Sequence, residues 1–345
     1  MSEVSLYRKY RPKDFSEVVG QDHIVSVLEG ALKKGAVGHA YLFVGTRGTG
    51  KTSVARIFSR ELGCAPEDIY ELDAASNNGV DDIRELTEGV HTLPFSSKYK
   101  VYILDEVHML SKAASNAFLK TLEEPPAHVI FILATTDPEK LPETIVSRCQ
   151  VFTFKKPSEH ILKDVVVSIA HKEGITLDSM GAEIIAIAGD GSFRDTLGIL
   201  QKVLNYSSDK KISADEIERV TGAPKSTLVN EYIHGLILRD TDKCMKAVHS
   251  AKETQVDMKL FLKLVMYTFR QGLLIRFAPS MKKEIESTLS ESNKIFLEGI
   301  AKETEGILAS KTLVIMLRVY EEFHDVFIPT LPLEILALKI ANREE

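Results

Sequence analysis

Hydrophobic and polar positions follow two different patterns along the 345-residue chain. In the first part, short apolar runs of strand length alternate with amphipathic stretches of helical spacing. Such repeated strand–helix units predict an α/β fold, a mostly parallel sheet with helices on both faces. Strands are expected at residues 39–44, 69–73, 100–106, 129–134 and 150–154, and helices from residue 53 and over 80–93, 111–124 and 143–148.

Beyond Lys155-Lys156-Pro157 the strand pattern ends and helical patterns take over. Gly222-Ala223-Pro224 marks a second boundary, and from Lys225 onward the pattern is helical throughout. No catalytic constellation is visible in this last part. The sequence therefore predicts three domains: a nucleotide-binding domain over 1–157, a small helical lid over 158–222 and an all-α domain over 223–345. The lid helices are expected at 160–173, 179–189, 193–206 and 215–221.

Composition narrows the class of protein. Hydrophobic residues make up 44% of the chain, which supports sizeable cores, and the net charge of −6 gives no global sign of nucleic-acid binding. The three cysteines, Cys64, Cys149 and Cys244, lack the spacing of a zinc site or a disulfide framework. No apolar run approaches the length of a membrane span, and the N-terminus shows no signal core. We therefore expect a cytoplasmic protein with reduced thiols and no membrane association.

The strongest chemical signal lies between the first strand and the helix after it. The stretch fits the P-loop pattern of a glycine, four free positions and Gly-Lys-Thr. Its glycines let backbone N–H groups converge on phosphate oxygens at the N-terminus of the following helix. Lys51 is expected at the β- and γ-phosphates of ATP and Thr52 at Mg²⁺. The predicted nucleotide-binding residues of this loop are Gly45, Thr46, Arg47, Gly48, Thr49, Gly50, Lys51 and Thr52.

A second acidic element supports the P-loop. The apolar run at 100–104 ends in Asp105 and Glu106, and ligands of α/β sheets bind at the carboxyl ends of strands. Asp105 is expected to bind Mg²⁺, and Glu106 to orient and polarise the attacking water. A strand that ends in acidic residues is common, so the pair gains its meaning from the P-loop. Together they predict hydrolysis of ATP rather than binding alone.

Four further positions have two interpretations each. Thr136 follows the next strand, where it could contact the γ-phosphate or simply form a Thr-Asp-Pro turn. Arg148 could cap a helix or act as an arginine finger on a neighbouring subunit. Arg194, in the first turn of a helix whose N-cap is Ser192, could close on the γ-phosphate or be solvated. The segment Tyr7–Pro12 mixes cations and aromatic rings, and could bind nucleic acid or pack along an adenine ring.

Taken together, these motifs closely resemble the bacterial DNA polymerase III gamma/tau clamp-loader subunits. The resemblance is dense from Tyr7 to about Asp195, whereas the helical C-terminal part matches only in position and length. The stretches that carry it are 10–12, 15, 19–21, 45–52, 72–77, 80–84, 105–111, 119–126, 134–138, 147–149 and 191–195.

The resemblance implies an AAA+ ATPase with a helical lid and a collar domain that holds a five-subunit ring. Its implied partners are the delta and delta-prime subunits, further copies of itself, the sliding clamp, and primer–template DNA bound through its backbone. Such a subunit uses ATP and Mg²⁺ within the DNA polymerase III holoenzyme. In these terms Arg148 would be the finger, Thr136 and Arg194 the first and second sensors, and Arg11 and Pro12 neighbours of adenine.

The chain departs from the family in two ways. Members usually carry a four-cysteine zinc module, but here Cys64 stands alone in the place of its first ligand. One thiolate cannot form a structural zinc site, so we expect no zinc. The chain also ends at Glu345, just past the expected collar, as a short form or a truncation would.

Two other functions remain possible from the sequence. Asp105-Glu106-Val107-His108 superficially resembles the box of a DExH helicase, which would need a second RecA-like domain. A non-hydrolysing clamp-loader subunit would instead have a degraded P-loop, whereas Lys51, Thr52, Asp105 and Glu106 are all present here.

Overall fold

The computed structural model describes residues 4–207, 210–283, 285, 291–302, 310–324 and 326–342. Contacts divide the chain into two compact units. The first comprises Met1–Ile161 together with Gly191–Asp195, and the second comprises Leu162–Asp190 together with Thr196–Glu345. The short piece Gly191–Asp195 thus belongs with the first unit although it follows it in sequence. The finer division into three domains stays a prediction.

A five-stranded parallel sheet forms the centre of the first unit, in the order β2-β3-β4-β1-β5. This confirms the predicted α/β class with a parallel sheet. The carboxyl ends of β1, β3 and β4 lie at one edge, because Val44 pairs with Thr135 and Leu104 with Leu133. The strands are β1 (Ala40–Val44), β2 (Ile69–Asp73), β3 (Lys100–Asp105), β4 (Val129–Thr135) and β5 (Gln150–Thr153).

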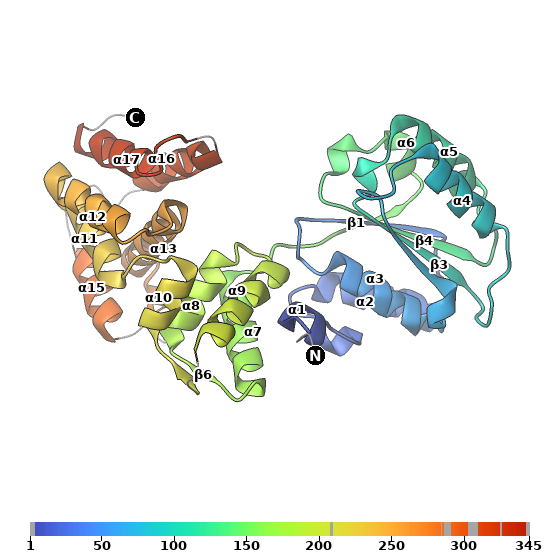
Figure 1. The fold of residues 1–345 in the computed structure, drawn as a ribbon, viewed down its shortest axis with the longest axis horizontal. Coiled ribbons are helices and arrows are strands. Elements are labelled where there is room, and N and C mark those ends of the chain that lie inside the picture. Colours follow the sequence, from blue (N-terminus) through green and yellow to red (C-terminus); the bar gives the residue numbers. More distant parts are fainter. Residues whose placement is uncertain are drawn as a thin grey trace. The chain divides into compact units, whose positions relative to one another are not determined.

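Helices cover both faces of this sheet (Figure 1). Along β1 successive side chains point to opposite faces. Tyr41 and Phe43 are fully buried with α2 (Asp22–Lys34) and α3 (Lys51–Glu61). Leu42 is fully buried on the other face. That face packs against α4 (Val80–Val90), α5 (Lys112–Glu123) and α6 (Glu143–Val146).

Helix α4 ends at Val90, three residues before the predicted end. The N–H groups of His91 and Thr92 bond to carbonyls three residues back, which tightens and closes the last turn. Pro94 then disfavours a helical conformation at the residue before it. The short elements of this unit are α1 (Leu6–Lys9), η1 (Phe15–Glu17), η2 (Pro66–Asp68), η3 (Val107–Met109) and η4 (Pro138–Lys140).

The second unit is mainly helical, as predicted. One expectation for it was wrong, because strand structure does not end at the first boundary. β6 (Thr176–Leu177) and β7 (Lys211–Ile212) form a small parallel pair, too short for an alternating pattern to reveal. The helices are α7 (Glu159–Lys172), α8 (Ser179–Ala188), α9 (Phe193–Tyr206), α10 (Ala214–Thr221), α11 (Ser226–Leu238), α12 (Thr241–Glu253), α13 (Met258–Phe277), η5 (Pro279–Met281), α15 (Glu291–Lys302), α16 (Ser310–Glu321), η6 (Glu322–His324) and α17 (Leu331–Asn342). Helices α7 and α9 each begin in the first unit and continue in the second. The predicted helical pattern at 286–290, 303–309 and 343–345 lies outside the described residues.

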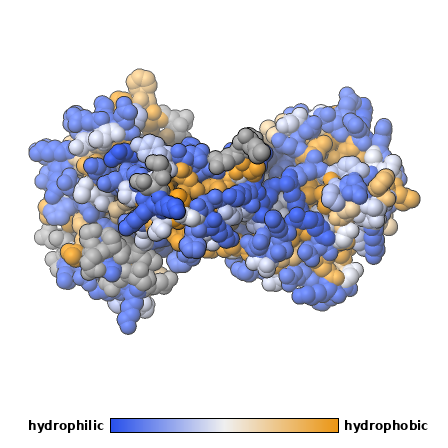
Figure 2. Space-filling view, turned by 60° about the horizontal axis from the view of Figure 1, so that its bottom comes forward, coloured by the Kyte–Doolittle hydropathy of each residue, from blue (hydrophilic) through white to orange (hydrophobic). Residues whose placement is uncertain are grey.

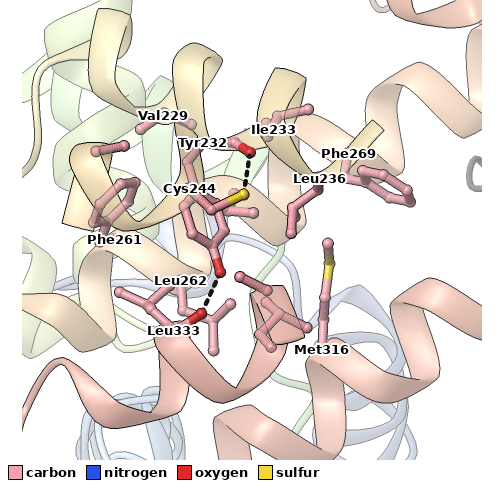
Figure 3. Packing of buried hydrophobic residues seen from close by; sticks show 14 of the residues in the cluster. Val229, Tyr232, Ile233, Leu236, Cys244, Phe261, Leu262, Phe269, Met316 and Leu333 are labelled. Carbon is pink, nitrogen blue, oxygen red and sulfur yellow. Dashed lines mark hydrogen bonds between the residues drawn. The ribbon is translucent and has the colours of Figure 1, made fainter. Parts of the chain in front are cut away.

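Helices α11, α12, α13, α16 and α17 share one large hydrophobic core (Figure 3). Tyr232 lies fully buried in it, and its hydroxyl donates a 2.6 Å hydrogen bond to the Leu333 carbonyl. The Cys244 thiol in turn donates to the Tyr232 carbonyl. Burial raises the pKa of this thiol to about 12, so it behaves as a packed apolar group.

The surface is mixed in polarity. Figure 2 shows hydrophilic residues over much of one face, with hydrophobic residues between them. Within the described ranges, no helix combines the length and the apolar character that a bilayer crossing requires.

Candidate nucleotide-binding site

The predicted phosphate loop lies between β1 and α3. Gly48 and Gly50 adopt left-handed backbone conformations, with φ of 78° and 103°, which glycine accommodates without a steric penalty. Gly50 is the N-cap of α3, so the loop leads directly into the first turn of an 11-residue helix. Unpaired N–H groups and the helix dipole favour an anion at this position.

Lys51 begins α3 and is 6% exposed. Its Nζ donates to the carbonyl oxygens of Gly45 at 2.6 Å and Thr46 at 3.0 Å, so the side chain folds back over the loop. Burial lowers the pKa of Lys51, and the nearby Glu106 and Asp105 carboxylates oppose this by favouring its charged form. The ammonium is therefore held between the loop and the acidic end of β3.

Thr52 and Asp105 meet although they lie far apart in sequence. The Thr52 hydroxyl donates to Asp105 Oδ2 at 2.7 Å. A hydroxyl and a carboxylate in contact at the start of a helix and the end of a strand supply the hard oxygen ligands that Mg²⁺ prefers. These residues fit the predicted metal role.

Glu106 and Thr136 also meet. Glu106 directly follows β3 with φ of 49°, a conformation that is uncommon for a residue with a side chain. Thr136, directly after β4, donates its hydroxyl to Glu106 Oε2 at 3.1 Å. Both side chains are partly exposed at the same sheet edge as the P-loop. The structure thus brings the candidate water-orienting group and the candidate first sensor into direct contact.

Arg194 reaches this region through the segment Gly191–Asp195. The Phe193 N–H donates to the Gly48 carbonyl at 2.9 Å, which ties the segment to the P-loop. Ser192 accepts from the Asp195 N–H, which confirms its predicted role as an N-cap. The Arg194 guanidinium lies 5.9 Å from the centre of the Tyr7 ring, a cation–π distance.

Arg11 lies beside the start of α3, since its Nε donates to Ser53 Oγ at 3.0 Å. Burial lowers its pKa, and the charge of Arg56 adds to this effect. Pro12, which follows Arg11, is partly buried. The N-terminal segment that carries both residues therefore lies against the P-loop helix, as an adenine-binding segment would.

Arg148 lies apart from these residues. It comes two residues before β5, and β5 is parallel to β1, so Arg148 lies at the amino edge of the sheet, opposite the P-loop edge. Its guanidinium forms a 2.6 Å ion pair with Glu123 and donates to the Thr144 carbonyl at 2.7 Å. In this position the Arg148 guanidinium contacts Glu123 and the Thr144 carbonyl, and no contact with a P-loop residue is found among the described residues.

Cys64, the residue in place of a zinc ligand, is buried. Its thiol donates to the Tyr99 carbonyl. Burial raises the pKa of this thiol to about 11, and the Asp68 carboxylate adds to the effect. A thiol with this pKa is protonated and is a poor metal ligand. Over the described residues, no group of three or more His, Cys, Asp or Glu is arranged to hold a metal ion. The expectation of no zinc stays a prediction.

Two contacts of this site were not anticipated from the sequence. The Phe193–Gly48 hydrogen bond joins segments that only the folded chain brings together. His108, noted earlier only as part of a helicase-like box, lies 3.5 Å from Glu106. In the sequence, only the position of His108 two residues after Glu106 could have indicated that the two side chains meet.

Comparison with known proteins decides the family. A family model described as DNA polymerase III, delta subunit, matches residues 20–79 and 67–158. The tau subunit of Bacillus subtilis DNA polymerase III is 36% identical over 94% of this chain and 60% of its own length. The gamma subunit of Buchnera aphidicola DNA polymerase III is 33% identical, over 80% of each chain. This chain belongs to the DNA polymerase III gamma/tau family.

The chain spans about half the length of several gamma/tau relatives. It covers 60% of the Bacillus subtilis protein and 47% of the Escherichia coli tau subunit, to which it is 34% identical. Among solved structures, the Thermotoga maritima RuvB branch migration motor aligns with a TM-score of 0.54 and 21% identity, over 66% of this chain and 79% of that one. This likeness shows the fold alone, a parallel sheet covered by helices and followed by further helices.

Proposed function

We propose that this gamma/tau family member is the ATP-hydrolysing motor subunit of the bacterial replicative clamp loader, which opens the sliding clamp and loads it on primer–template DNA. The observation that carries the proposal is the Thr52–Asp105 hydrogen bond, because it joins the P-loop to the acidic end of β3. Lys51 lies at the same edge of the sheet, as does the Glu106–Thr136 pair.

The residues have separate roles in this proposal. Lys51 contributes a positive charge to the β- and γ-phosphates, and Glu106 orients the attacking water and polarises it. Thr52 and Asp105 would hold Mg²⁺, which neutralises phosphate charge when bound. Thr136 and Arg194 would report the γ-phosphate, and Arg11 and Pro12 would lie along adenine. Arg148 would complete the site of the adjacent subunit.

The partners follow from the family. The relatives are named as DNA polymerase III subunits, which supports a role in that complex. For this chain we include the delta and delta-prime subunits, further copies of itself, the clamp, and the DNA backbone among its partners, in the cytoplasm. The expected collar, residues 223–345, would hold the ring together.

The two alternatives lack such support. In the described part of the second unit, the only strands are β6 and β7, and no second five-stranded sheet for a helicase is present. A non-hydrolysing subunit would not need a glutamate and a threonine in contact beside an intact P-loop.

The test is the ATPase rate with and without the clamp, primed DNA and the partner subunits. We expect strong stimulation only when all of them are present. Glu106→Gln should leave ATP binding intact and reduce turnover by about a hundredfold or more, since it removes a carboxylate that acts on water. Normal turnover of Glu106→Gln would contradict the role of Glu106, and strand separation by the chain alone would favour the helicase.

A further inference from the structure

The side chain of His108 lies beside that of Glu106. Glu106 is the N-cap of the short helix η3, and the Met109 N–H donates to its carbonyl at 2.8 Å. This tight turn, together with the φ of 49° at Glu106, brings the two side chains to the same side of the chain. His108 Nδ1 lies 3.5 Å from Glu106 Oε2.

A second contact fixes the imidazole in place. His108 Nδ1 is also 2.9 Å from Thr135 Oγ1. Thr135 is fully buried at the end of β4, and its Oγ1 accepts a hydrogen bond from the Asp137 N–H at 3.0 Å. The His108 side chain is only 10% exposed, so the ring cannot turn away into solvent. His108 thus links Glu106 to the rigid end of a central strand.

Both contacts of the Glu106 carboxylate fall on one oxygen. Thr136 Oγ1 donates to Oε2 at 3.1 Å, and His108 Nδ1 approaches the same Oε2. The described residues provide no hydrogen bond to Oε1. The carboxylate is therefore anchored through Oε2, and Oε1 is the oxygen left to accept from a water.

The chemistry of the imidazole decides where its proton lies. Nδ1 faces an anionic oxygen and a hydroxyl oxygen. A lone pair at Nδ1 would repel the carboxylate 3.5 Å away, whereas an N–H there can donate to Thr135 Oγ1 and attracts Oε2 electrostatically. The Nδ1–H form fits this environment, with Nε2 directed elsewhere.

We infer that His108 is a positioning residue for Glu106: its Nδ1–H, held at Thr135 Oγ1, lies 3.5 Å from Oε2 and attracts it electrostatically while the Thr136 hydroxyl donates to it, so that Oε1 faces the attacking water. This inference rests on the proposed ATPase function and assigns a second anchor to the same site. In this inference His108 acts only through the orientation of the carboxylate, without a contact of its own to the nucleotide or the attacking water. Without it, Glu106 keeps one anchor and regains rotational freedom, which weakens the alignment that hydrolysis needs.

Three substitutions test the inference in the assembled complex with clamp and primed DNA. His108→Ala should lower kcat for ATP about tenfold, the effect of one lost electrostatic contact to a charged group, and change KM less than twofold. His108→Asn places an amide N–H near the position of Nδ1 and should restore kcat to within about threefold of the wild type. His108→Gln places its amide near the position of Nε2 and should resemble His108→Ala. His91→Ala, at an exposed histidine after α4, is the matched control and should behave as wild type.

A measurement without turnover separates this inference from the proposed function. In protein labelled with ¹⁵N-histidine, the long-range proton–nitrogen spectrum should show His108 with its proton on Nδ1, assigned by its loss in His108→Ala. A proton on Nε2 alone would overturn the inference, as would a His108→Ala enzyme with wild-type kcat or rescue by Gln but not by Asn. If wild type shows no ATPase while Nδ1 carries the proton, the proposed function fails instead.

Discussion

At the scale of single residues, one buried carboxylate fixes the loop at residues 95–97 by hydrogen bonds to its backbone. Asp68 is fully buried and accepts from the backbone N–H groups of Ser96 at 3.0 Å and Ser97 at 2.8 Å, and also from that of Phe95. The Phe95 side chain is 86% exposed, so apolar packing does not fix this loop. Burial raises the pKa of Asp68, but the hydrogen bonds from Ser96, Phe95 and Ser97 outweigh this and lower it to about 2.

We predict that Asp68→Asn destabilises the first unit. The amide keeps one acceptor oxygen and turns an NH₂ group toward the loop N–H groups, so the midpoint of the thermal unfolding of this unit should fall by roughly 3–8 °C at pH 7. The native pKa is depressed below the unfolded value near 3.8, so the carboxylate stabilises above pH 4. This contribution is lost as the pH falls toward 2.

Calorimetric scans of both proteins between pH 7 and pH 2 check this prediction. The difference in unfolding midpoint between wild type and Asp68→Asn should become smaller as the pH falls from 4 to 2. Asp81→Asn is the control, because that carboxylate is 95% exposed and forms a surface ion pair with Arg84. If the unfolding midpoint falls equally in Asp68→Asn and Asp81→Asn, the loop does not depend on Asp68.

Residue chemistry was easiest to predict where it is local. The P-loop and the acidic end of β3 follow from short runs of sequence, and the structure places Lys51, Thr52 and Asp105 together. The His108–Thr135 and Phe193–Gly48 contacts could not be predicted, because each joins residues from separate elements that no sequence motif relates. They depend on strand order and on the path of the chain, which periodicity does not specify.

At the scale of elements, buried hydrogen bonds tie the helices of the second unit together. The Tyr232 hydroxyl of α11 donates to the Leu333 carbonyl in the first turn of α17. Burial raises the pKa of this phenol well above its ordinary value, so it stays a neutral donor. The hydrogen bond thus joins two helices within the hydrophobic core, and Figure 3 shows it beside the second one, from the Cys244 thiol to the Tyr232 carbonyl.

Tyr232→Phe should lower the unfolding free energy of this unit by about 1–2 kcal/mol, because the Leu333 carbonyl loses its buried partner while the ring still fills its place. Urea unfolding followed by circular dichroism measures the change. Tyr206→Phe, at a side chain that is 58% exposed, should change the free energy little. Equal free energies of unfolding for Tyr232→Phe and Tyr206→Phe would show that the Tyr232 hydroxyl does not stabilise the contact between the helices.

Most elements could be predicted, but not all of their ends. Helix α9 has the predicted bounds, and the strands of the large sheet lie where their apolar runs are. Strands β6 and β7 were missed because two residues cannot show a period of two. The order β2-β3-β4-β1-β5 was also not predictable, since a pattern shows that strands are buried but not which strands are neighbours.

At the scale of the whole molecule, the position of Arg148 favours assembly. It lies at the amino edge of the sheet and pairs with Glu123, away from the P-loop of its own chain. If Arg148 is a finger, as we propose, it would act on the site of another subunit rather than on that of its own chain. The catalytic unit in this account is therefore a ring in which each nucleotide is bound by one chain and completed by the next.

Arg148→Ala should leave ATP binding by the isolated chain unchanged and reduce the ATPase rate of the assembled ring by about a thousandfold. The control is Glu123→Gln, which removes the ion pair within the chain but keeps the guanidinium. If both variants lose the same activity, Arg148 has a structural role. If Arg148→Ala weakens ATP binding by the isolated chain, the assignment as a finger is wrong.

The central claim is that a nucleoside triphosphate binds against Lys51 while Asp105 and Glu106 lie at its metal and its attacking water. Calorimetric titration of the folded chain with Mg·ATP at two temperatures tests it most directly. We predict one site per chain, and an affinity that falls about a hundredfold or more in Lys51→Ala, which loses a charged contact to phosphate. No heat from the wild type at either temperature, or equal affinity in Lys51→Ala, would contradict the account.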